Sequence, residues 1–193
     1  MPITTLNVQV LCTNSIAPGI EVVNWGAQSF DEFRCNIPEL GREIRRRFDE
    51  HPMGPDVPVR MSASRLRALS RDLLAGVRRR GELTRFVMGQ ADWQLCICVF
   101  TECHRAGHYF WPVPGPHPLE DPASTLLDVH RALDREIGQI LAGVDLRQTT
   151  VIAFSLHGME PNTSQLCIER AHDGESLPFV SGPGAGRGRA CRV

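Results

Sequence analysis

Residues 93–100, WQLCICVF, form the clearest predicted strand of the chain. Almost every position is apolar, which is typical of a central parallel strand that is covered on both faces of a sheet. Farther along, residues 124–142 repeat apolar side chains at helical spacing, and residues 149–155, TTVIAFS, predict a second buried strand. The three segments together predict a β-α-β unit, in which the two strands are parallel because a crossover helix connects them.

The segments upstream extend this unit to an α/β fold with a mostly parallel sheet flanked by helices. Two β-like runs are followed by two helical patterns, at residues 6–12, 20–25, 38–48 and from Ser64 onward. The second helix has a candidate end at residues 78–81, RRRG, although its apolar pattern resumes as far as Met88. Residues 101–122 are rich in Pro, Gly, His and aromatic residues and predict a long loop of the kind that often carries function.

Length and composition indicate one domain without a large charged partner. A chain of 193 residues is long enough for one well-buried core, which we expect over residues 1–180, and the Gly/Arg-rich residues 181–193 predict a disordered tail. The formal net charge of −1 gives no reason to expect nucleic acid or an acidic membrane surface as a partner. The chain has no lysine, which excludes a phosphate-binding loop of the G-x-x-x-x-G-K-[ST] type.

The cysteines and the hydropathy pattern predict a cytoplasmic protein. There are seven cysteines, an odd number, and several of them lie in strand-like runs, which favours reduced, buried thiols over a disulfide framework. No apolar stretch approaches the roughly 20 residues that cross a bilayer, and the first residues do not resemble a secretory signal. The oligomeric state is not indicated by any of these features.

Three histidines follow the two predicted parallel strands. His104 and His108 come after the first strand and His157 comes after the second. Because α/β folds bind ligands just outside the carboxyl ends of parallel strands, we expect the three imidazoles at one edge of the sheet. Neutral imidazole is a common ligand of zinc and related metals, so the pattern predicts a metal site. An H-x-x-x-H pair fits either a helical turn or a tight loop, and Gly107 favours the loop.

Other candidate residues carry a weaker signal. Glu102 and Cys103 are further candidate metal ligands, although both are equally typical of an ordinary loop. His51, His117 and His130 are interpreted as loop or surface residues. No G-x-S-x-G segment is present, so a Ser-His-Asp hydrolase is not supported.

Two segments resemble a known family. ECHRAGH at residues 102–108 resembles the E-x-D-x-x-G-H segment of the type I phosphodiesterase / nucleotide pyrophosphatase group of the alkaline-phosphatase superfamily. SLHGM at residues 155–159 resembles the S-D-H-G-M segment of the same superfamily. Residues 24–27 and 35–52 resemble some bacterial members, and the resemblance covers most of residues 5–165.

The resemblance implies an alkaline-phosphatase-like core and a two-metal hydrolase. Such enzymes act on small-molecule phosphate esters through a Thr or Ser nucleophile, and paired ions stabilise the attacking and leaving oxygens. The resemblance also implies that the metal is zinc, with manganese as an alternative. One ion would contact His104 and His108, and the other would contact His157.

The chain departs from the family pattern at several points. His104 and Leu156 stand where the family has aspartate; histidine can still bind a metal, whereas leucine cannot, so we expect the second ion to bind weakly or not at all. The nucleophile segment and the distal histidine of the family are not found, so no catalytic residue is assigned and the core is expected to be incomplete. The chain is then either a fragment of a longer enzyme or a degenerate homologue.

Three functional hypotheses follow. The first is a metal-dependent phosphoester, in particular phosphodiester, hydrolase. The second is a non-catalytic pseudo-hydrolase that binds a metal or a phosphorylated ligand. The third is a structural zinc domain that uses Cys103, His104 and His108 and unfolds when the metal is removed.

Overall fold

The structure is a computed structural model, and it describes residues 3–6, 19–26, 32–53, 61–112, 117–155 and 158–159. The chain divides into two units, Met1–Pro161 and Asn162–Val193, and every described residue belongs to the first. The predicted domain end at residue 180 and the predicted tail at residues 181–193 lie outside the described residues.

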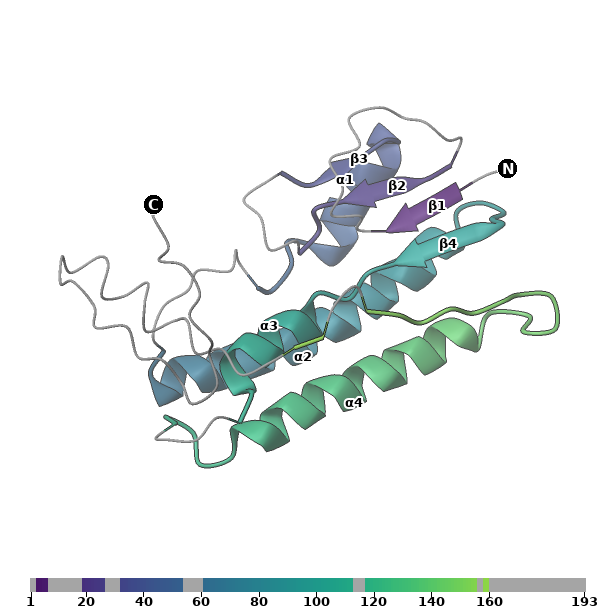
Figure 1. The fold of residues 1–193 in the computed structure, drawn as a ribbon. Coiled ribbons are helices and arrows are strands. Elements are labelled where there is room, and N and C mark those ends of the chain that lie inside the picture. Colours follow the sequence, from purple (N-terminus) through teal and green to yellow (C-terminus); the bar gives the residue numbers. More distant parts are fainter. Residues whose placement is uncertain are drawn as a thin grey trace, which may run out of the picture. The chain divides into compact units, whose positions relative to one another are not determined.

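The described part contains a small mixed sheet of four strands in the order β3-β2-β1-β4 (Figure 1). β1 pairs in parallel with both β2 and β4, whereas β3 pairs with β2 in the antiparallel direction. The strands are β1 (Ile3–Leu6), β2 (Glu21–Val23), β3 (Arg34–Cys35) and β4 (Leu95–Cys98). The mixed α/β class agrees with the sequence prediction. β1, however, begins before the predicted run 6–12, most of which lies outside the described residues.

Four helices accompany the sheet in the described part: α1 (Pro38–Phe48), α2 (Ala63–Met88), α3 (Glu102–Phe110) and α4 (Pro122–Leu141). α1 has the predicted bounds, with proline in its first turn, where the missing N–H is not needed. α2 is capped by Ser62, whose side chain accepts from the Arg65 amide, and Asp121 caps α4 by accepting from the Ser124 amide. None of these helices is long and apolar enough to cross a membrane.

α2 connects two hydrophobic clusters. Its 26 residues extend over about 39 Å. Its N-terminal half packs against α3 and α4, and its C-terminal half packs against α1 and β2. The first cluster contains Met53, Leu66, Leu69, Leu73, Val77, Ala106, Tyr109, Phe110, Val129 and Ala132. The second contains Ile20, Val22, Trp25, Leu40, Ile44, Phe48, Leu83 and Val87. Arg80 therefore lies on α2 at the junction of the two clusters.

The candidate helix end at residues 78–81 is wrong, because α2 continues to Met88. Gly81 serves close packing instead: a Cβ at this position would collide with the carboxylate of Glu136 on α4. Rotating the carboxylate would not remove the conflict, since the Cβ of Glu136 would also lie only 3.0 Å away. Gly81, which suggested a helix end in the sequence, instead lies at a close contact between α2 and α4.

Gly81→Ala should therefore lower the free energy of unfolding by about 1–3 kcal/mol, the usual cost of overpacking. Gly138→Ala is the matched control, because Gly138 lies inside α4 with nothing within 4 Å of its added Cβ. This control should raise stability by up to about 1 kcal/mol through helix propensity. Urea denaturation of both variants measures the difference, and equal stabilities would contradict the proposed contact.

The predicted loop at residues 101–122 contains a helix. The residues of α3 that are buried include Glu102, Arg105, Ala106, Tyr109 and Phe110, which follow helical spacing. Two of these five residues are charged, so the apolar residues alone give too short a helical pattern. For this reason the helix was not predicted from the sequence.

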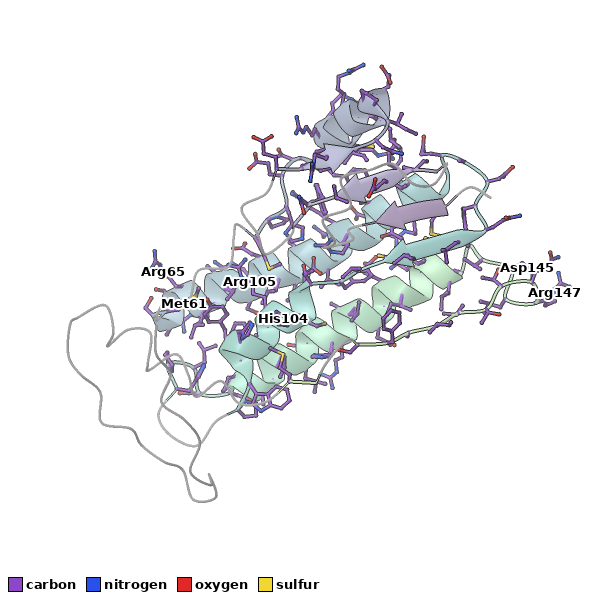
Figure 2. All side chains as sticks on the ribbon, turned by 45° about the horizontal axis from the view of Figure 1, so that its top comes forward. Met61, Arg65, His104, Arg105, Asp145 and Arg147 are labelled. Atoms are coloured by element: carbon purple, nitrogen blue, oxygen red, sulfur yellow. The ribbon has the colours of Figure 1, made fainter. Side chains whose placement is uncertain are left out.

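The prediction of a second strand in the β-α-β unit is also wrong. Residues 149–155 have no regular secondary structure, and the side chains of Ile152 and Phe154 are each 76% exposed. α4 carries the chain away from α3, and Figure 2 shows Asp145 and Arg147 in the turn beyond the helix, remote from His104. The following segment returns to α3, where Met159 lies against Gly107. Residues 149–155 are therefore largely apolar but pair with no strand in the described part of the sheet.

Candidate metal centre

His104 and His108 lie one turn apart on α3, and their rings are in contact, edge to face. Their Nε2 atoms are 2.8 Å apart, and the two rings are nearly perpendicular at 88°, with centroids 4.4 Å apart. In a hydrogen bond between two neutral imidazoles, one Nε2 donates and the other accepts. The structure thus brings these two predicted residues together on a helix, rather than on the loop that Gly107 had favoured.

The histidine pair, meaning His104 and His108, fits two positions of a zinc site. Tetrahedral zinc with Zn–N bonds of about 2.0–2.1 Å separates two ligand nitrogens by about 3.3 Å. The two Nε2 atoms would have to separate by only about 0.5 Å from their present distance. Among the described residues no group of three or more His, Cys, Asp or Glu side chains is placed to hold a metal. His157, the third predicted ligand, lies outside the described residues.

Gly107 has a packing role between the two histidines. A Cβ on Gly107 would come within 2.6 Å of Met159 Cε, so a larger residue here would have to displace the end of the Met159 side chain. The contact holds residues 158–159 against the turn of α3 that carries the histidine pair. Residues 102–108 and 158–159, which belong to the two segments singled out in the sequence, are therefore neighbours.

Cys103 and Glu102 are not part of the histidine pair. Burial, together with the nearby charge of Glu102, raises the pKa of the Cys103 thiol to about 11, so the thiol stays protonated at neutral pH. Because the described residues contain no three-ligand group, the combination of Cys103 with His104 and His108 is not assembled here. Glu102 belongs to a different set of contacts.

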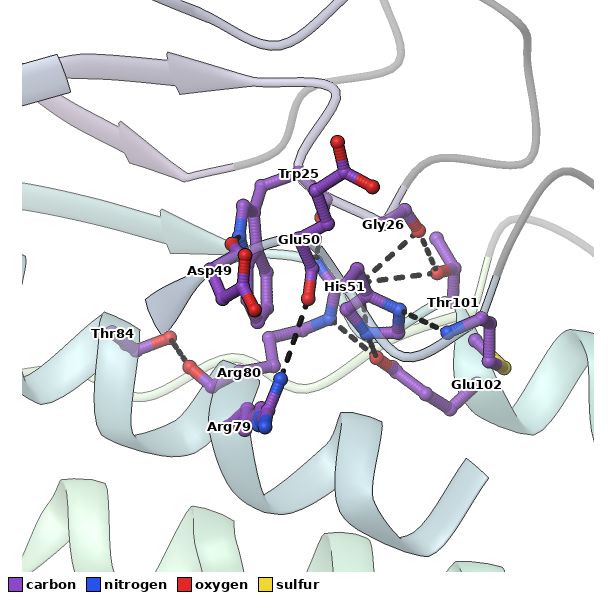
Figure 3. Close-up of polar contacts among 11 residues, drawn as sticks. Trp25, Gly26, Asp49, Glu50, His51, Arg79, Arg80, Thr84, Thr101 and Glu102 are labelled. Carbon is purple, nitrogen blue, oxygen red and sulfur yellow. Dashed lines mark hydrogen bonds and ion pairs between the residues drawn. The ribbon is translucent and has the colours of Figure 1, made fainter. Parts of the chain in front are cut away.

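A buried charge cluster lies at the first turn of α3 and is formed by His51, Arg80, Thr101 and Glu102 (Figure 3). Arg80 Nε and His51 Nε2 both lie 2.8 Å from Oε1 of Glu102. The side chains of His51, Arg80 and Glu102 are 2%, 3% and 0% exposed, so these contacts are shielded from water.

The guanidinium of Arg80 also holds the backbone that follows β2. Its Nη1 donates to the carbonyl of Trp25 at 3.0 Å, and its Nη2 donates to the carbonyl of Gly26 at 3.2 Å. Thr101 accepts from Nη2 at 3.3 Å and donates to the same Gly26 carbonyl at 3.0 Å. Only arginine, with its fixed fork of donors, can make these contacts at once.

The hydrogen bonds define the protonation of His51. Its Nδ1 accepts from the amide of Met53 at 3.2 Å, so the ring proton is on Nε2 and is donated to Glu102. Burial lowers the pKa of His51, although the bond to Glu102 opposes this, and the imidazole is neutral. Arg80 Nη2 and His51 Nε2, at 3.5 Å, are then both donors, and their contact is not a hydrogen bond.

Glu102 is ionised and compensates the charge of Arg80. Burial alone would raise the pKa of Glu102, but the charge of Arg80 and the hydrogen bonds from His51 and Arg80 bring it below its ordinary value. The cluster therefore contains one cation, one anion and one neutral imidazole. The other carboxylate oxygen, Oε2, is buried without a hydrogen-bond partner among the described residues.

His51 lies in a loop, as predicted, but its side chain is not on the surface, because its ring is enclosed by two glycines. A Cβ on Gly26, which has a φ of +72°, would collide with the ring, and a Cβ on Gly76 would come within 2.7 Å of Cε1. Gly76 inside a strong helical pattern was the one available signal of a close neighbour. His130 is exposed, and His117 lies in a loop where it accepts from the Leu119 amide, as expected for both.

Comparison with protein families places this chain, with its mixed α/β fold, in the phosphoester hydrolase-like class. Residues 28–185 match the family described as type I phosphodiesterase / nucleotide pyrophosphatase, and the chain belongs to this family of the alkaline-phosphatase superfamily. The resemblance predicted from residues 102–108 and 155–159 is confirmed. The family acts on phosphate esters and is generally metal-dependent. Comparison with curated proteins and with solved structures found no match.

Proposed function

We propose that this chain is a metal-dependent phosphodiester hydrolase-like domain that binds a divalent ion through His104 and His108. The observation that carries the proposal is the convergence of the two Nε2 atoms at 2.8 Å on a helix of the family's own motif segment. Zinc is the ion that suits two imidazoles best, and manganese is the alternative. His157 is the proposed ligand from the second motif segment.

The roles of the residues follow from their chemistry. A bound ion would act as a Lewis acid toward an oxygen of the phosphate ester. His104 and His108 would supply neutral nitrogen donors, which requires that each ring carries its one proton on Nδ1 and presents an unprotonated Nε2 to the ion. α3 presents both rings on one face, and Gly107 admits Met159 beside them. No residue is proposed as the nucleophile.

The proposal extends to the domain and its compartment. We propose that residues 1–180 form one alkaline-phosphatase-like domain with a mostly parallel sheet, followed by a disordered tail at residues 181–193. A cytoplasmic location is proposed because cysteines 35, 96, 98 and 103 are free thiols. Burial raises the pKa of Cys96 to about 11, which keeps that thiol protonated and unreactive.

The second candidate function is a pseudo-hydrolase that binds the metal or a phosphorylated ligand without turnover. It is favoured by Leu156, which stands at an aspartate ligand position of the family pattern and has no donor atom. The loss of a carboxylate removes both a ligand and a negative charge, so a second ion is bound weakly.

The full chain loaded with zinc or manganese should hydrolyse bis(4-nitrophenyl) phosphate, and a chelator should abolish the reaction. Elemental analysis should find one tightly bound ion per chain, because Leu156 cannot complete a second site. His108→Ala should lower both metal content and turnover at least about 100-fold, since it removes a ligand. The matched control is His130→Ala on α4, which should change neither. Bound metal without turnover would favour the pseudo-hydrolase. A chain that binds no metal would overturn the metal-dependent hydrolase and would leave only a phosphorylated ligand for the pseudo-hydrolase.

A further inference from the structure

We propose that the buried charge cluster is a positioning device for α3, so that Glu102, Arg80 and His51 determine where the histidine pair points. The expected effect on metal binding rests on the proposed function, whereas the positioning of α3 does not. None of the three is proposed to touch substrate or metal; they act through the backbone of α3.

The first step is that α3 depends on tertiary contacts. It has only nine residues, and helices shorter than about 12–15 residues are marginal on their own. Its N-cap residue, Thr101, makes no capping hydrogen bond, because its hydroxyl donates to the Gly26 carbonyl instead. The position of α3 is therefore set by what its side chains contact.

The second step concerns the direction of those contacts. Ala106 and Phe110 bury the apolar face of α3, but apolar contacts have little directional preference. Glu102 is the first residue of α3, and its Oε1 is held at 2.8 Å by donors from two other elements, α2 and the segment after α1. Hydrogen bonds weaken steeply with misalignment, so two donors on one oxygen restrict the rotation of the helix about its axis.

The third step is the distance along the chain from this anchor to the histidines. His104 lies two residues after Glu102, and His108 lies one turn beyond His104. A small rotation of α3 at Glu102 would turn both imidazoles together relative to the neighbouring elements, and so would change where the histidine pair points. Such supporting contacts commonly change metal affinity by about 10–100-fold when they are lost.

Glu102→Asp tests the proposal because it keeps the charge but shortens the side chain by one methylene, so the carboxylate can no longer reach both donors. Co²⁺ is the probe, since its visible d–d spectrum reports the ligand geometry. Glu102→Asp should weaken Co²⁺ binding by about 10–100-fold and shift the spectrum. His51→Gln, which keeps the Arg80–Glu102 pair, should weaken it by about 10-fold or less.

Glu136→Asp is the matched control. Glu136 pairs with Arg85 at 2.8 Å and is also largely buried, but this pair joins α2 to α4 rather than to α3. The same substitution should lower the melting temperature and leave Co²⁺ affinity and spectrum unchanged. Equal effects of both Glu→Asp variants, or an unchanged affinity in folded Glu102→Asp, would overturn the positioning role. If Glu102→Asp does not fold, the same comparison is made with His51→Gln.

A second measurement separates this proposal from the proposed function. In the metal-free chain, the imidazole ¹⁵N signals of His104 and His108 report the surroundings of both rings, which change when α3 turns relative to its neighbours, as well as their Nε2–Nε2 contact. If the wild-type chain binds no metal, the proposed function fails, but Glu102→Asp should still shift both sets of signals while Glu136→Asp leaves them in place. Unshifted signals in Glu102→Asp would overturn the positioning role independently of any metal.

Discussion

Replacing Arg80 by methionine should lower the free energy of unfolding by about 3–5 kcal/mol, the usual cost of leaving one partner of a buried ion pair alone. The Arg80 side chain is 3% exposed and the Glu102 side chain is 0% exposed, so water cannot take over the lost contact. The variant also removes the donors to the carbonyls of Trp25 and Gly26. Urea denaturation at neutral pH measures the loss.

Two companion variants identify the origin of the loss. Arg85→Met removes a pair of the same 2.8 Å length from the same helix, but the Arg85 side chain is 31% exposed, and the expected cost is about 1 kcal/mol or less. Arg80→Met combined with Glu102→Gln removes the uncompensated charge and keeps an acceptor for His51. This double variant should be more stable than Arg80→Met alone. If Arg80→Met costs no more than Arg85→Met, the cluster is not an energetically important ion pair.

Replacing His104 by alanine should weaken zinc binding at least about 100-fold, because one of two converging nitrogens is lost. His104→Asp should keep much of the affinity and shift the preference from zinc toward manganese, since a carboxylate oxygen is the harder ligand. The prediction is specific to this chain, in which His104 stands where the family pattern has aspartate.

Competition titration against a chromophoric chelator measures both constants. His130→Ala is the control, because this exposed histidine lies on α4 and donates to the Leu126 carbonyl of its own helix. An unchanged zinc affinity in His104→Ala would remove this residue from the metal site. An equal loss in the alanine and aspartate variants would show that position 104 supports the fold and does not bind the ion.

The family and three of the helices could be predicted from local patterns. Residues 102–108 and 155–159 indicated the family because their motif letters depend only on the order of residues, and the family match spans both segments. α1, α2 and α4 were predicted because their apolar residues repeat at helical spacing, although the end of α2 was placed too early. The pairing of His104 with His108 followed from their spacing, although the helix that carries them did not.

Other features were decided by contacts between segments far apart in the chain. α3 was hidden because two of its buried positions are charged, and a buried Glu102 is compatible with a helix only when Arg80 and His51 are beside it. The apolar run at residues 149–155 has strand-like composition, but composition does not supply a neighbouring strand, and its side chains stay exposed.

From its amino-acid sequence alone, this protein could be assigned to its family, its α/β class and its candidate metal-binding residues, because each depends on residue type and spacing along one segment. The tertiary structure alone decided that His51 is buried, that Gly81 and Gly107 are packing positions, and that Glu102 anchors the histidine helix. In each case the deciding partner is distant in sequence, and the burial of a polar group is determined by whether that partner arrives with a matching donor or charge.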